Sequence, residues 1–148
     1  MPRKAATRRV RPKPLDRLEP FEDDCVIVVI ETPKGSPNDG DPLDVLVLMD
    51  APVFPGCIVP SRPVGVIEAE QTEGGKTERN DRLLAVAAHS VAHRSIHELE
   101  DLGSDLVAQI EHFFVSYNEM KGKRFEVKRR AGSTGARALV IAAMKRRR

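Results

Sequence analysis

The chain has 148 residues, 41% hydrophobic and 31% charged, which suits one globular domain and excludes a large multidomain enzyme. Its net charge of +2 hides a split, because residues 1–20 and 145–148 are basic while residues 21–144 hold 13 basic and 20 acidic residues, a net charge of −7. An acidic body suits divalent cations, whereas basic ends suit phosphate polyanions or solubility.

The ends of the chain differ in composition from its middle. Residues 1–23 form a basic, proline-punctuated arm that we expect to be disordered, residues 24–144 the folded domain, and residues 145–148 a basic tail. No apolar run approaches the ~18 residues of a membrane span, and the basic N-terminus lacks the apolar core of a secretion signal. We therefore expect a cytoplasmic protein without a membrane partner. Nucleic acid is not an expected partner either.

Short apolar stretches separated by turn residues predict a sheet in the first two thirds of the chain. The predicted strands are Cys25–Ile30, Asp44–Leu48, an extended region over Gly56–Glu70, and Arg82–Ala87, with polar Gln71–Asp81 as a connecting loop. Because no helical pattern separates these strands, the sequence favours an antiparallel barrel or strongly curved sheet over a parallel one.

Helical periodicity begins only in the last third. Asp101–Met120 carries one apolar stripe at three- and four-residue spacing, with Ser104 expected to cap its start and Gly122 just past its end. Phe125–Val127 is predicted as a last short strand and Ala136–Lys145 as a closing helix. The predicted fold class is α+β, with one long amphipathic helix and a C-terminal helix.

An acidic motif precedes the second predicted strand. Asp39, Asp41 and Asp44 fall within six residues, and three carboxylates so close together stay ionised at low cost only when a cation compensates them. Oxygen ligands alone favour Mg²⁺ or Mn²⁺. The alternative is a plain Asn-Asp-Gly turn leading into a strand, for which acidic residues are common. Spacing by itself leaves both interpretations open.

Five segments in order resemble the soluble family I inorganic pyrophosphatases, over roughly residues 25–128. They are the acidic signature Asp39–Leu48, then Pro55-Gly56, Arg62–Val66, Asn80–Val86 and His112–Tyr117, and Ile30–Asn38 also looks like the family's first strand and its exit. The resemblance implies a small, closed, OB-like antiparallel β-barrel with flanking helices. It also implies a cytoplasmic, Mg²⁺-dependent hydrolase of diphosphate, acting in phosphate metabolism and commonly assembled as a homo-oligomer.

The resemblance implies roles for individual residues. Asp39, Asp41 and Asp44 would hold metal ions that activate a water for in-line attack on phosphorus, Asp41 would also orient that water, and Glu31 matches an acidic site residue. Tyr117 matches a tyrosine that contacts phosphate, although its spacing also fits the apolar stripe of the helix.

The chain departs from the family pattern at three places. After Asn38 it lacks a few tens of residues that carry cationic and phenolic groups and strands that close the barrel. Lys34 lies before that junction and does not replace the missing cations, but it could reach phosphate from its loop. The second metal-binding region is replaced by the expanded 68–82 loop, in which Asp81 is a candidate ligand and either Glu70 or Glu73 a candidate replacement for the first family aspartate. Arg82 is a candidate replacement for the family lysine and so a candidate contact to the substrate. Asn118 occupies the position of another family lysine, for which Lys121 or Lys123 could compensate, unless both belong to a solvated helix end.

Two functions follow from these observations. The intact acidic signature favours an inorganic diphosphatase that converts diphosphate to two phosphates. The missing cationic segment favours a truncated, catalytically weak homologue that binds Mg²⁺ or an anion without turnover.

Overall fold

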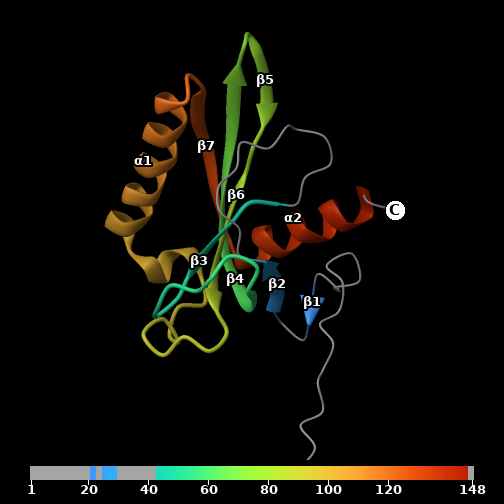
Figure 1. Ribbon diagram of the computed structural model, residues 1–148, viewed down its shortest axis with the longest axis vertical. Helices are drawn as coiled ribbons and strands as arrows, with labels where there is room; N and C mark the ends of the chain where they lie inside the picture. The colour runs from blue at the N-terminus through green and yellow to red at the C-terminus, as the bar shows by residue number, and fades with distance from the viewer. Residues whose placement is uncertain (1–20, 23–24, 30–42, 147–148) are drawn as a thin grey trace, which may run out of the picture.

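The structure is a computed structural model that describes residues 21–22, 25–29 and 43–146, and it consists of a mixed sheet with one long helix on each face (Figure 1). The strands are β1 (Phe21–Glu22), β2 (Cys25–Val29), β3 (Val45–Leu48), β4 (Ile58–Glu73), β5 (Lys76–Arg79), β6 (Arg82–Ala87) and β7 (Arg124–Gly132). The helices are the short 3₁₀ helix η2 (Leu99–Leu102), α1 (Ser104–Met120) and α2 (Ser133–Arg146). The predicted α+β class is therefore confirmed.

The long strand β4 organises the sheet. It spans 16 residues and pairs antiparallel with β2 and then β7 along one edge, and with β6 and then β5 along the other. Ser61 of β4, for example, faces Val26 of β2 and Ala87 of β6. A shift in register between Pro63 and Gly65 marks a bulge in β4.

The pairing of β3 differs from the expected antiparallel arrangement. β3 lies parallel to β6, with Val45 opposite Leu83 and Leu48 opposite Val86. The described strands follow the order β1-β2-β4-β6-β3, which does not return to its start. Parallel pairing places the beginnings of β3 and β6 at the same end of the sheet, and the candidate site lies at that end.

Apolar side chains alternate between the two faces of the sheet, as the period of a strand requires. On one face Ile67, Leu84 and Val86 pack with Val107 and Ile110 of α1. On the other face the core contains Val28, Val66 and Leu83 with Ala136 and Val140 of α2. These strands are buried on both sides, which explains why their sequences read as continuous apolar runs.

The segment predicted as a loop, Gln71–Asp81, is instead a hairpin. β4 continues to Glu73, the chain turns at Gly74 and Gly75, which have φ of 56° and 80°, and β5 runs back beside it. Two adjacent glycines with positive φ are typical of a tight hairpin turn, whose strands here are polar because they extend beyond the apolar core.

Helix α1 confirms one predicted end and corrects the other. Gly122 has a φ of 73° just after the helix, as expected. Ser104, however, is the first helical residue rather than the cap, because Gly103 occupies the N-cap position and no side chain caps the helix. Among residues 21–22, 25–29 and 43–146, no helix is both long and apolar enough to cross a membrane.

Candidate functional site

The structure places six of the residues selected from the sequence, namely Asp44, Asp81, Arg82, Tyr117, Lys121 and Lys123. The other four, Glu31, Lys34, Asp39 and Asp41, lie outside the described residues. The site can therefore be built from the beginnings of β3 and β6, the face of α1 above them, and the turn after α1.

Asp44 and Arg82 meet because β3 and β6 run parallel. One residue before the paired positions Val45 and Leu83, they stand side by side, and the Leu83 N–H donates to the Asp44 carbonyl at 3.0 Å. Arg82 Nη1 donates to Asp44 Oδ2. The Asp44 side chain is 67% exposed whereas that of Arg82 is 10% exposed. A buried cation thus holds a solvent-facing carboxylate.

Arg82 lies in an aromatic and polar surrounding. Its guanidinium carbon is 5.3 Å from the ring centre of Phe114 on α1 and 5.4 Å from that of Phe125 on β7. Nη1 also donates to Asn80 Oδ1 at 2.6 Å. Burial lowers the pKa of Arg82, and the nearby Asp44, Asp81 and Tyr117 oppose that shift. Arginine remains protonated in proteins even when it is buried, so Arg82 is a permanent positive charge at the site.

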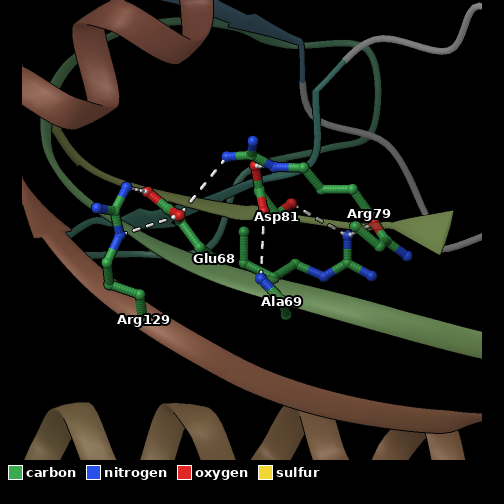
Figure 2. A network of polar contacts seen from close by, with 7 residues as sticks. Glu68, Ala69, Arg79, Asp81 and Arg129 are labelled. Carbon is green, nitrogen blue, oxygen red and sulfur yellow. Dashed lines mark hydrogen bonds and ion pairs between the residues drawn. The ribbon is translucent and has the colours of Figure 1, made fainter.

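Asp81 sits in a network of ion pairs and hydrogen bonds on the β4 edge (Figure 2). Its Oδ1 accepts the Ala69 N–H at 3.1 Å, and its Oδ2 accepts from Arg79 Nε at 2.6 Å. Arg79 Nη2 lies 3.7 Å from Glu68, which Arg129 binds through two nitrogens at 2.6 and 3.2 Å. The Arg129 hydrogen bonds lower the pKa of Glu68 despite its partial burial. Both Asp81 oxygens therefore have protein donors.

The structure distinguishes the two lysines after α1. Lys121 Nζ donates to the Tyr117 hydroxyl at 2.5 Å, whereas Lys123 Nζ pairs with Glu73 Oε2 at 2.9 Å. Asn118 is buried and donates from Nδ2 to the Phe114 carbonyl at 2.8 Å. Lys121, one helical turn beyond Tyr117, is thus the cation that accompanies the phenol.

Two polar residues at the site were not selected from the sequence as site residues. Asn80 accepts from Arg82 and donates from Nδ2 to Gln71 Oε1 at 2.7 Å, and Gln71 is itself buried. The sequence signal for this connection was an arginine at the start of an otherwise apolar strand, because a buried arginine requires acceptors. Which residues supply them depends on how the strands pair.

The oxygen donors at the site suit a hard divalent cation. From the residues that the structure describes, Asp44 Oδ1 receives no hydrogen bond, so it is available as a ligand. The same residues contain no group of three His, Cys, Asp or Glu side chains arranged around one point. A complete oxygen-ligand set would need Asp39 and Asp41, which precede Asp44 on the same stretch of chain.

Comparison with known proteins identifies the family. A profile described as inorganic pyrophosphatase matches residues 22–148. An inorganic pyrophosphatase of Pseudomonas aeruginosa is 38% identical over 115 residues, which cover 76% of this chain and 63% of the relative. One of Synechocystis sp. is 36% identical over 95 residues, covering 64% of this chain and 54% of the relative. The chain thus spans between about half and two thirds of the length of these relatives.

The fold agrees with solved structures of the same description. A crystal structure of inorganic pyrophosphatase from Thermus thermophilus superposes with a TM-score of 0.74 at 26% identity, covering 87% of this chain and 95% of that one. One from Coxiella burnetii superposes with a TM-score of 0.66 at 32% identity, covering 82% of this chain and 71% of that one. These likenesses confirm the expected resemblance.

Proposed function

Because the chain belongs to the inorganic pyrophosphatase family, we propose that it hydrolyses diphosphate to two phosphates with Mg²⁺ as its cofactor. The observation that carries the proposal is the family match over residues 22–148, which includes Asp39, Asp41 and Asp44. The relatives favour this function over the alternative of a homologue that binds without turnover. In keeping with this activity we propose a cytoplasmic homo-oligomer that acts in phosphate metabolism.

The proposed metal ligands are Asp39, Asp41, Asp44 and Asp81, with Mn²⁺ as a second cation of suitable chemistry. A bound divalent cation would lower the pKa of a water and so provide hydroxide at neutral pH. Asp44 Oδ1 receives no hydrogen bond from the described part of the chain, which supports the role of Asp44 as a ligand. Asp81 would have to bind the cation beside its present donors, Ala69 and Arg79.

Asp41 and Glu31 are the proposed catalytic residues, with Asp41 orienting the attacking water. Lys34, Tyr117, Lys121 and Lys123 are the proposed contacts to diphosphate. The hydrogen bond between Lys121 and Tyr117 supports this assignment, because it sets an ammonium and a phenol side by side for phosphate oxygens. Arg82 also belonged to this group by sequence, but its buried guanidinium favours a different role.

Release of phosphate from diphosphate tests the proposal. We expect slow release that requires Mg²⁺ and that Asp41→Asn abolishes, because the substitution removes a ligand charge and the group that orients water. Asp105→Asn, which changes an exposed aspartate in the first turn of α1, serves as the matched control and should retain the rate. Mg²⁺ binding without any phosphate release would instead support the homologue without turnover.

A further inference from the structure

We propose that Arg82 is a positioning residue, which holds the Asp44 carboxylate in one orientation through Oδ2 and so leaves Oδ1 for a cation, and that it does not contact diphosphate. This inference rests on the proposed function, since it concerns the Mg²⁺ site of that activity. It assigns Arg82 a role opposite to the one expected from sequence, in which Arg82 replaces a phosphate-binding lysine.

The first support is that the hydrogens of one nitrogen are fully used. Nη1 carries two N–H groups, and they have two close acceptors, Asp44 Oδ2 and Asn80 Oδ1. Two acceptors on one nitrogen fix the guanidinium in its own plane. Asn80 is in turn fixed by buried Gln71, so the orientation of Asp44 is set from the interior of the sheet.

The second support is the packing of the guanidinium. Phe114 from α1 and Phe125 from β7 both lie within cation–π distance, and only 10% of the arginine side chain is exposed. A group that approaches diphosphate from solution needs a mobile or exposed end, as Lys121 has. Arg82 instead has the burial and fixed contacts of a support.

The third support is the contrast with its partner. The Asp44 side chain is 67% exposed, and a short exposed carboxylate ordinarily samples several rotamers. Arg82 occupies Oδ2, while Oδ1 receives no hydrogen bond from the residues that the structure describes, and this selects the orientation that a metal ligand needs. Hydrogen bonds to a ligating carboxylate commonly govern metal affinity in this way. A lysine offers no planar guanidinium to stack on both rings while bridging Asp44 and Asn80, so Arg82→Lys isolates geometry from charge.

The test compares variants of the full chain by calorimetric titration with Mg²⁺ and by thermal unfolding in EDTA. Arg82→Lys should weaken Mg²⁺ binding roughly 10- to 100-fold. On an Asp44→Asn background the same change should have no further effect, because the carboxylate that Arg82 positions is gone. Arg62→Lys is the matched control, since Arg62 also lies on a strand but donates to the Ile96 carbonyl at 2.7 Å. It should leave Mg²⁺ affinity unchanged.

Other results would overturn the inference. Unchanged Mg²⁺ affinity together with a raised KM for diphosphate would show that Arg82 contacts the substrate. Tighter Mg²⁺ binding in Arg82→Gln, which removes the charge, would show that Arg82 competes with the cation for Asp44. Arg82→Gln also serves if Arg82→Lys fails to fold, and the positioning role predicts weaker binding for both.

The inference and the proposed function fail in different ways. Phosphate release by the wild-type chain together with Arg82-independent Mg²⁺ binding would overturn only the inference. Mg²⁺ binding that depends on Arg82 and Asp44, without phosphate release, would overturn only the proposed function. Absence of Mg²⁺ binding by the wild-type chain would overturn the inference, and phosphate release would still decide the function.

Discussion

The Asp81 side chain accepts a hydrogen bond from a backbone N–H of β4, at the short connection between β5 and β6. The Asn80 N–H donates to the Ala69 carbonyl at 2.8 Å, and the Ala69 N–H returns to Asp81 Oδ1 at 3.1 Å. The carboxylate therefore takes the place of a backbone carbonyl beside β4. With 4% of its side chain exposed, Asp81 shields this hydrogen bond from water.

We expect Asp81→Ala to destabilise the protein by about 1–3 kcal/mol, because it leaves the buried Ala69 N–H without an acceptor. Asp81→Asn keeps an acceptor oxygen and should cost less than Asp81→Ala. Thermal unfolding in EDTA measures both changes apart from any metal. Equal stability of Asp81→Ala and the wild-type chain would contradict this role.

The sequence selected several side chains of the candidate site, but it did not predict their contact partners. Asp44, Arg82 and Tyr117 were all selected from motifs, and the structure brings Asp44 together with Arg82. That contact depends on the parallel register of β3 and β6. The two residues are 38 positions apart, so no local sequence pattern indicates that they meet. For the same reason Gln71 and Asn80 could not be recognised as the support of Arg82.

The first residue of helix α2, Ser133, is hydrogen-bonded to the carboxylate of Glu98, which lies far from it in the sequence. Glu98, just before η2, accepts the Ser133 N–H at 2.7 Å and the Ser133 hydroxyl at 2.5 Å. A Cβ at Gly132 would lie 2.6 Å from Glu98 Oε2, so glycine is needed for this approach. The negative charge satisfies an orphan N–H of the helix and complements its dipole. Glu98 thus ties η2 to α2.

The Glu98 contact predicts a specific pH dependence. The Ser133 hydroxyl and N–H lower the pKa of Glu98 below its ordinary 4.5. Because the pKa is depressed in the folded state, the stabilisation is complete above about pH 4.5 and is lost as the pH falls through the folded-state pKa. Glu98→Gln should therefore reduce stability at neutral pH and flatten its decline in acid.

Denaturant unfolding between pH 3 and 7 measures this effect. Glu100→Gln, an exposed carboxylate on η2, is the matched control and should retain the wild-type slope. A Glu98→Gln curve parallel to that of the wild-type chain would show that the Ser133 contact contributes nothing to folding.

At the element scale, apolar patterning predicted most elements and misjudged their relations. The strands over 25–30, 44–48 and 82–87 were located within a residue or two, because β-branched runs with flanking turns are a local signal. The 71–81 hairpin was taken as a loop because its strands are polar. The direction of β3 was misjudged because the antiparallel expectation assumed that strands adjacent in sequence pair with each other. β3 instead pairs with β6, although β4 and β5 lie between them in the sequence.

In the described part of the chain, the sheet is covered on both faces and has an unpaired edge at β3. β3 pairs with β6 on one side, and within residues 21–22, 25–29 and 43–146 no strand lies on its other side. β2, by contrast, pairs with β1 along its outer side, opposite Cys25 and Val26. Unpaired strand edges favour association with another chain.

We therefore expect a homo-oligomer in which the outer edge of β3 is covered. Light scattering at micromolar concentration should give a mass of two or more times the 16.4 kDa of one chain. A stable monomer at that concentration would contradict the assembly and would leave the β3 edge without a partner chain.

We propose that this chain is a Mg²⁺-dependent diphosphatase slowed by the absence of a cationic segment. The most direct measurement is phosphate release from Mg²⁺-diphosphate by the chain itself, beside the same chain with a family-like Lys-Tyr-Glu to Tyr-Gly segment restored after Asn38. Losing one electrostatic stabiliser of a transition state costs ~10²–10³ in rate. We predict release above the Asp41→Asn background that is at least about 10²-fold slower than with the segment restored. No release above that background would contradict the proposed activity, and equal rates would contradict the account of the missing segment.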